Sequence, residues 1–467
     1  FLYPEGQEDI PCNLYLDIPT DYEVGGLAGA GPHYDFVNFH QLVDSPFLAG
    51  RSLTHLQFPL DGIPIHIWIK GEMAMNPATL LHDIRRYSEV QLRMFGHFPE
   101  KEYHYLLVIL PFSYRHGVEH HQSTVISMGP GVRMQEPKMY RSLLEICSHE
   151  FFHTWNVKAL RPVDMYPYRY EGENYSRLHY VTEGVTTYYG DLMLWKGNVW
   201  DEGVWLSSVN GELARHYGMG GHDQVSLEQA SFDSWVNGYK SGGAPNQRIS
   251  FYTKGYLVAM LLDAEIRRRT DHQHSLDEVM REMYHRLARK ARGYTKADYQ
   301  GIIEELCGSS FDDFFAKMIS GTASLLPALQ TMGEMYGWQL MKARPESLSD
   351  YWWGLKITEE NGKGAKITQM RPNSPALTAG LHLDDEIIAV NGRKVDSNWE
   401  ALLAYAMQEN DITLHHFHQG KLLQTSLNVP SKAFHEQPLF VVDAQRSQEQ
   451  MAQLQAWRSL PQPNPVS

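Results

Sequence analysis

The stretch HEFFH at residues 149–153 stands in a sequence with helical periodicity. Residues four apart on a helix lie on the same face, about one turn from each other, so His149 and His153 can bind one cation. Neutral imidazole suits Zn²⁺, and Glu150 projects from the adjacent position, where a carboxylate can reach a water held by the metal. The stretch therefore predicts a metal site on a helix.

A third ligand candidate follows in the sequence Thr182-Glu183-Gly184, which leads into another helical stretch. A catalytic zinc needs three protein ligands and one open position for water, and two His with one Glu are a known set. Glu183 completes that set, so we expect one zinc ion per chain. The alternative is a chance pair of histidines in a chain that has 23 of them.

The length of 467 residues is too great for one hydrophobic core, since domains usually have about 50–250 residues. Residues 1–72 alternate short apolar runs with Gly, Pro and Asp, which predicts a β-rich N-terminal domain that we expect to be incomplete. Residues 73–335 begin as α+β and become helical. Short strands with glycine turns return at residues 340–430, and residues 431–467 form a C-terminal extension and tail. The predicted fold class is multidomain α+β.

Charge and composition exclude several classes of protein. A net charge of −14 does not favour nucleic acid as a partner, and three widely separated cysteines do not indicate disulfides. No window reaches the roughly 20 apolar residues of a membrane span. The chain opens at Phe1 without Met, so we expect upstream residues to have been removed, and any targeting signal with them. We expect a soluble protein and leave its compartment open, with the cytoplasm favoured over the periplasm.

Several motifs resemble one family in order and spacing. HEFFHTWNVKALRP at 149–162 and TEGVTTYYG at 182–190 resemble the glycyl aminopeptidase family of gluzincin peptidases, which are relatives of thermolysin and aminopeptidase N. VDSPFLAG at 43–50 and FYTKG at 251–255 fit the same family. The resemblance implies a thermolysin-like catalytic domain and a zinc-dependent aminopeptidase that acts on peptides, with small N-terminal residues such as Gly or Ala preferred.

The resemblance implies roles for two further residues. The segment Gly117-Val118-Glu119-His120 is similar to the family's GGLEH motif, although His116 replaces the first Gly. Glu119 would bind the α-ammonium of the substrate. Tyr252 matches a tyrosine beside the zinc and would donate a hydrogen bond to the oxyanion, while Glu150 acts as general base. Each has an ordinary alternative, an exposed loop acid for Glu119 and a helix-start aromatic among 26 tyrosines for Tyr252.

The sequence SPALTAGLHLDDEIIAVNGRKV at 374–395 resembles the PDZ signature. Upstream, Trp353-Gly354-Leu355 could be the loop whose backbone amides receive the carboxylate of a C-terminal peptide. The alternative is a PDZ domain that only packs on the catalytic unit. The pair His415-His416 has no evident third ligand, so we expect surface residues without a metal there.

Two other functions stay open. An endopeptidase would use the same zinc chemistry in an open cleft without an amine anchor, and a requirement for a free amino-terminus separates the two. A non-catalytic protein would bind peptides through its PDZ domain and keep the zinc domain as a relic. The intact HExxH motif, the third ligand Glu183 and Tyr252 argue against such decay.

Overall fold

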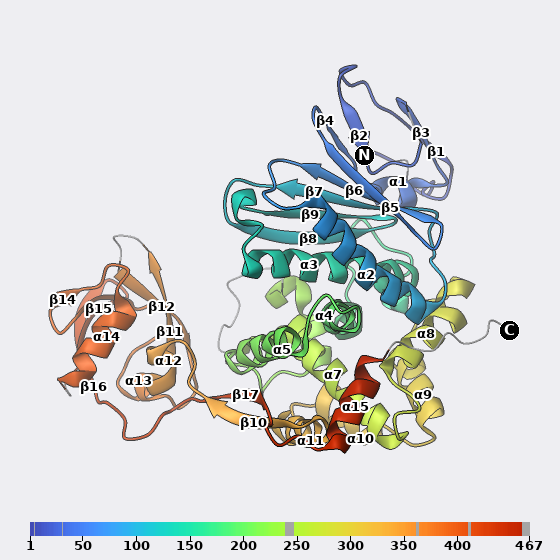
Figure 1. The fold of residues 1–467 in the computed structure, drawn as a ribbon. Helices are drawn as coiled ribbons and strands as arrows, with labels where there is room; N and C mark the ends of the chain where they lie inside the picture. The colour runs from blue at the N-terminus through green and yellow to red at the C-terminus, as the bar shows by residue number, and fades with distance from the viewer. Residues whose placement is uncertain (4, 30, 239–246, 361–363, 410–411, 460–467) are drawn as a thin grey trace.

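The computed structural model describes the chain up to residue 459, apart from residues 4, 30, 239–246, 361–363 and 410–411. Figure 1 shows a small group of strands near the N-terminus, a central body of one sheet and many helices, and a smaller β-rich unit set to one side. The predicted multidomain α+β class is confirmed. Among the described helices, none has the length and apolar character needed to cross a bilayer.

The N-terminal strands form two short antiparallel pairs, β1 with β3 and β2 with β4. Their bounds, with the helix α1 between them, are β1 Cys12–Tyr15, β2 Glu23–Gly25, β3 His33–Phe36, α1 Phe39–Val43 and β4 Leu48–Gly50. A small core of its own holds this unit together, consisting of Leu27, Tyr34, Phe36, Phe39 and Leu42.

The central sheet has the strand order β5-β6-β7-β9-β8. Its strands are β5 Thr54–Leu60, β6 Ile63–Lys70, β7 Tyr103–Ile109, β8 Tyr114–His120 and β9 Ser123–Gly129. Strands β6, β7 and β9 are parallel, while β5 and β8 are antiparallel additions at the two ends. The expected domain boundary after residue 72 would assign β5 and β6 to the N-terminal domain, whereas β6 pairs with β7. A strand's alternation indicates that it has a buried face but does not identify its partner.

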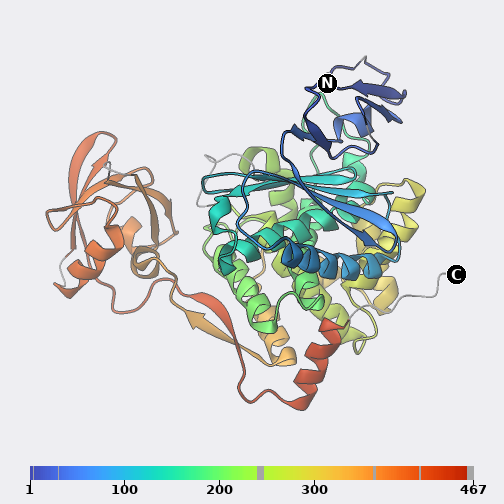
Figure 2. The same cartoon turned by 45° about the horizontal axis from the view of Figure 1, so that its top comes forward.

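Two helices lie along one face of this sheet, α2 (Pro77–Phe95) and α3 (Pro137–Phe152), as Figure 1 and Figure 2 show. Helix α2 starts where the Asn76 side chain accepts from the Ala78 N–H, and it ends at Gly96, whose positive φ terminates the helix. Helix α3 packs against β8 and β9. It thereby carries HEFFH under the edge of the sheet.

The remaining helices form a lobe on the far side of α3. They are α4 Thr186–Lys196, α5 Glu202–Tyr217, α6 Leu227–Phe232, α7 Phe251–Arg269, α8 Leu276–Arg286, α9 Lys296–Cys307, α10 Asp312–Phe314 and α11 Leu326–Tyr336. Helix α7 is buried along almost its whole length, and its Arg267 pairs with Asp263 one turn earlier at 3.0 Å. A capping box of Ser275 and Glu278 starts α8.

The PDZ-like unit is inserted between two strands that pair with each other. Strand β10 (Trp338–Ala343) and strand β17 (Gln437–Val442) form an antiparallel ribbon, and the unit stands at its end. Its own sheet has the order β11-β12-β13-β15-β16. The elements are α12 Leu348–Trp353, β11 Leu355–Glu360, β12 Gly364–Met370, α13 Pro375–Thr378, β13 Glu386–Val390, β14 Arg393–Lys394, α14 Trp399–Gln408, β15 Ile412–His418 and β16 Lys421–Leu427.

The chain then returns to the central body through α15 (Gln448–Arg458). Trp457 in this helix is fully buried, and its indole N–H donates to the Tyr188 hydroxyl of α4 at 3.0 Å. Its ring packs edge-on against Trp205. Part of the expected C-terminal extension thus completes the catalytic core, while the end of the tail, residues 460–467, lies outside the described residues.

We therefore predict that Trp457→Ala lowers the free energy of unfolding by about 3–5 kcal/mol, because a large buried ring leaves a cavity. The measurement is the melting temperature of the central body followed by circular dichroism. The matched control is Met451→Ala, since Met451 is 49% exposed on the same helix. Equal melting of Trp457→Ala and the parent would show that α15 is dispensable.

Candidate functional site

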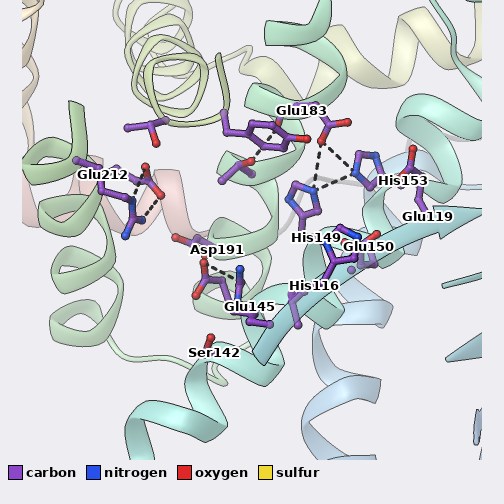
Figure 3. A pocket seen from close by; sticks show the side chains of 17 residues that line it. His116, Glu119, Ser142, Glu145, His149, Glu150, His153, Glu183, Asp191 and Glu212 are labelled. Atoms are coloured by element: carbon purple, nitrogen blue, oxygen red, sulfur yellow. Dashed lines mark hydrogen bonds and ion pairs between the residues drawn. The ribbon is translucent and has the colours of Figure 1, made fainter. Parts of the chain in front are cut away.

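His149 and Glu150 lie on the last turn of α3, and His153 caps the end of that helix. Glu183 lies on the π-helical segment η4 (Tyr180–Val185). The two Nε2 atoms of His149 and His153 are 3.0 Å apart. Glu183 Oε2 is 3.5 Å from the first and 3.4 Å from the second. Figure 3 shows the three side chains pointing toward one another. They form a nearly equilateral triangle of ligand atoms.

This triangle fits a tetrahedral zinc ion. Zn–N and Zn–O bonds of about 2.0–2.1 Å place neighbouring ligand atoms about 3.3 Å apart in a tetrahedron. The three observed separations, 3.0, 3.4 and 3.5 Å, lie around this value. The donor set of two imidazoles and one carboxylate leaves one position open, as a catalytic zinc requires.

Asn156 fixes the orientation of the ligands. The Nδ1–H of His153 donates to the Asn156 carbonyl oxygen at 2.7 Å, which leaves the Nε2 lone pair for a metal. The Asn156 side-chain amide donates to Val181 O at 2.9 Å and to Thr186 Oγ1 at 3.0 Å. One residue therefore joins the segment after HEFFH to the segment that carries Glu183.

Two glycines bring Tyr252 to the same place. A Cβ atom added to Gly184 would lie 2.6 Å from the Cα of Gly255, and one added to Gly255 would lie 2.7 Å from the Cα of Gly184. Segment η4 and helix α7 therefore cross in direct backbone contact. Glu183 precedes one glycine and Tyr252 stands three residues before the other, so this crossing places both at one cavity.

Glu150 is 5% exposed, and its Oε2 atom has no hydrogen-bond partner among the described residues. Its carboxylate lies against the backbone of the edge strand β8, because a Cβ atom on Gly117 would be 2.3 Å from Glu150 Oε1. Burial, together with the carboxylates of Glu119 and Glu183, raises the pKa of Glu150 to about 8. The environment thus favours a proton on this carboxyl group.

The surroundings shift the pKa values of the three candidate ligands in different directions. Burial lowers the pKa of His149. For His153, burial acts in the same direction, but the nearby carboxylates of Glu183 and Glu119 outweigh it and raise the pKa to about 10. Burial would raise the pKa of Glu183, yet the two imidazoles lower it strongly. The pocket is therefore tuned to hold positive charge between these three groups.

Glu119 lies on β8, which pairs only with β9 among the described strands and so forms the edge of the sheet. Its carboxylate lies within 4.8 Å of ligand atoms of Glu150 and His153. Behind it, Lys158 pairs with Asp44 from the N-terminal part of the chain. His120 donates to the same Asp44 carboxylate at 3.0 Å.

The six predicted catalytic, anchoring and ligand residues all line one cavity of about 670 Å³. They are Glu119, His149, Glu150, His153, Glu183 and Tyr252. The cavity continues into a charged region with Glu145, Asp191 and Glu212, as Figure 3 shows. Burial raises the pKa of Asp191. A second cavity of about 470 Å³ opens on the other side of Glu119 and Glu183.

The loop Trp353-Gly354-Leu355 lies in the PDZ-like unit and does not line this cavity. The N–H of Gly354 donates to the Asp350 carbonyl at 3.1 Å, where it caps α12. Trp353 and Leu355 are buried, and the ring of Phe434 lies against Gly354. In this arrangement the Gly354 amide is already bonded, so it is not free to receive a peptide carboxylate.

Comparisons with known proteins agree with this geometry. The model of the M61 glycyl aminopeptidase family matches residues 142–258, which contain all three ligand candidates. The model of the M61 N-terminal domain matches residues 1–51, and that of the PDZ domain matches residues 343–411. The chain thus matches the M61 glycyl aminopeptidase family in its catalytic part and in its N-terminal part. It is a metallopeptidase of the aminopeptidase-like type.

Solved structures resemble this chain to different degrees. The crystal structure of an aminopeptidase N family protein from Idiomarina loihiensis is 25% identical, with a TM-score of 0.86 over 97% of this chain and 80% of that one. An M1 zinc metallopeptidase from Deinococcus radiodurans is 13% identical over 67% of this chain and 64% of that one. Its TM-score of 0.43 is too low to support an argument. No curated protein matches the sequence.

Several supporting residues of this site have no role in the sequence argument. These residues, Asn156, Lys158, Gly184 and Gly255, all lie inside the quoted motifs. Their position in the motifs is the only signal in the sequence that points to them. Their duties depend on contacts between segments that are distant in sequence, which local periodicity does not reveal. The approach of Gly117 to Glu150 is of the same kind.

We predict that Gly117→Ala lowers kcat for peptide hydrolysis by about 100-fold, because a Cβ atom would displace the Glu150 carboxylate by about 1 Å. The measurement is steady-state kinetics with parallel metal analysis, which should show an unchanged metal content. Gly301→Ala is the matched control, since a Cβ atom there meets nothing within 4 Å. An unchanged kcat in Gly117→Ala would contradict the assigned role of Glu150.

Proposed function

We propose that this protein is a zinc-dependent aminopeptidase that hydrolyses the first peptide bond of peptides, with Gly or Ala preferred at the N-terminus. The observation that supports it best is the position of Glu119. Its carboxylate lies beside the ligand triangle, on the edge strand of the sheet and within 4.8 Å of ligand atoms of Glu150 and His153.

His149, His153 and Glu183 would hold the zinc ion. When bound, zinc supplies a Lewis acid and lowers the pKa of a water molecule toward about 7. Glu150 accepts the proton of the attacking water and passes it to the leaving amine. Tyr252, which lines the cavity, donates a hydrogen bond to the oxyanion that develops on the carbonyl oxygen.

The geometry near Glu119 suits an exopeptidase. Standard bond lengths place an α-nitrogen about 2.5 Å from the carbonyl carbon of its own residue. A substrate with its ammonium group on Glu119 therefore brings its first carbonyl close to the ligand triangle. An internal residue has an amide nitrogen there, which offers no charge to this carboxylate.

The edge of the sheet supports the same placement. Strand β8 has only one partner among the described strands, and an extended peptide can bind such an edge through backbone hydrogen bonds. A peptide aligned in this way would run past Glu119, which is part of β8, and past Glu150, which contacts β8. The charged part of the 670 Å³ cavity would take the residues after the cleaved bond.

The preference for Gly or Ala rests on the family. The cavity of about 470 Å³ next to Glu119 has room for larger side chains. Hydrolysis rates of Gly, Ala, Leu and Phe dipeptides, measured as kcat/KM, test the preference directly. Faster hydrolysis of Leu or Phe than of Gly or Ala would contradict it.

We predict one zinc ion per chain at the catalytic site and loss of hydrolysis after treatment with a chelator. Elemental analysis should show that His149→Ala/His153→Ala loses this ion, because two of its three ligands are gone. Glu150→Gln should keep the metal and lose turnover, because only the proton acceptor is removed. A Glu150→Gln variant that hydrolyses like the parent would contradict the mechanism.

We also predict that Glu119 confers the requirement for a free amino-terminus. Glu119→Gln keeps the shape and removes the charge, and it should cost about 2–4 kcal/mol in transition-state stabilisation, or ~30- to 1000-fold in kcat/KM. Acetylated peptides cannot pair with Glu119, so their low rate should not change and serves as the internal control. Equal hydrolysis of free and acetylated peptides by the parent would favour the endopeptidase alternative.

A further inference from the structure

A second cluster of potential metal ligands lies in the PDZ domain. Asp385 directly precedes β13 and is 1% exposed. His382 lies three residues earlier on the surface, in the loop after α13, and His418 ends β15. One ligand atom from each of these three residues lies within 4.8 Å of the others. The cluster belongs to a different domain from the catalytic cavity.

The Asp385 carboxylate is the centre of the cluster. Its Oδ2 atom accepts the backbone N–H of His382 at 3.0 Å and lies 3.1 Å from His416 Nδ1. Its Oδ1 atom lies 2.7 Å from His418 Nδ1. The side chains of His416 and His418 meet the same carboxylate, because residues two apart on a strand point to the same face.

His416 is buried, whereas the sequence argument placed it on the surface without a metal. Its Nε2 lies 3.0 Å from the Thr425 hydroxyl of the neighbouring strand β16. His416 is therefore a buried neighbour of Asp385: its Nδ1 lies beside one carboxylate oxygen, and the other oxygen faces His418.

The two outer imidazoles form a ligand pair. The rings of His382 and His418 lie with their centroids 4.7 Å apart and their planes tilted by 42°. Together with the Asp385 carboxylate, the two imidazoles bring three potential ligands to one place. A cavity of about 600 Å³ lined by Asp385 and His418 gives solvent and ions access to the cluster.

We propose that His382, Asp385 and His418 bind a second divalent transition-metal ion of the zinc type, in the PDZ domain. Two imidazoles and one carboxylate form a ligand set that suits zinc, and water can take the fourth position. In a tetrahedral site neighbouring ligand atoms lie about 3.3 Å apart, so the 2.7 Å between Asp385 Oδ1 and His418 Nδ1 must widen as the ion binds. The exposed side chain of His382 can rotate to complete the site.

The bound ion would join two separate parts of the domain. His382 and Asp385 belong to the connection between α13 and β13, and His418 belongs to the β15–β16 hairpin. A metal that binds only the folded state stabilises it in proportion to the logarithm of the free metal concentration. The proposed role of this site is therefore structural.

The test uses the full chain with His149→Ala/His153→Ala, which removes the proposed catalytic site whether or not that site holds zinc. After removal of metal with a chelator, isothermal titration with ZnCl₂ should show one equivalent bound. The further change His418→Ala should abolish this binding. His415→Ala is the matched control, because His415 lies on the other face of β15 and should leave the equivalent unchanged.

Melting curves provide an independent measurement. Zinc at 100 times its Kd should raise the stability of the His149→Ala/His153→Ala variant by about 2.7 kcal/mol. It should not raise the stability of the same variant with the further change His418→Ala. Circular dichroism checks that the variants are folded. The proposal is overturned if the His149→Ala/His153→Ala variant binds no zinc, or if the further change His418→Ala leaves its zinc binding unchanged. Either result leaves the proposed peptidase chemistry unaffected.

Discussion

The hydrogen bonds of Asn156 are the contacts on which the active site depends. Its carbonyl oxygen accepts from His153 Nδ1, and its side chain binds the segment that carries Glu183. All of these atoms are buried, so an interrupted bond would leave polar groups without partners. The network therefore fixes the distance between two helical segments, and this distance sets the size of the ligand triangle.

The electrostatics of the cavity follow from that arrangement. Glu150 and Glu183 are brought under the sheet edge beside Glu119, and burying several carboxylates together is costly unless positive charge compensates them. The His153 imidazole compensates in part, as its raised pKa shows. A divalent cation in the triangle would relieve the rest and would remove the reason for a proton on Glu150. The same compensation explains why a substrate ammonium group fits next to Glu119.

The chemistry-bearing residues could be predicted from the sequence because they follow local rules. His149 and His153 are four apart on one helix, and Glu183 opens a second helical stretch in a recognisable context. The partners of distant segments could not be predicted in this way. The pairing of β6 with β7, the burial of Trp457 and the contact between Gly184 and Gly255 depend on the tertiary fold. The prediction that His416 lies on the surface was wrong for the same reason, since its carboxylate neighbour Asp385 is 31 residues earlier in the chain.

The insertion of the PDZ domain has a mechanical consequence. Its two ends are held in one antiparallel ribbon of β10 and β17, so the domain cannot swing as a simple C-terminal appendage would. It also meets the catalytic domain, where Lys356 Nζ and Gln369 Nε2 donate to the Gly218 carbonyl at 2.8 and 2.9 Å. Gly218 ends helix α5, and the same helix places Glu212 and Arg215 in the catalytic cavity. The position of the PDZ domain and the far wall of the active site are thus set by one helix.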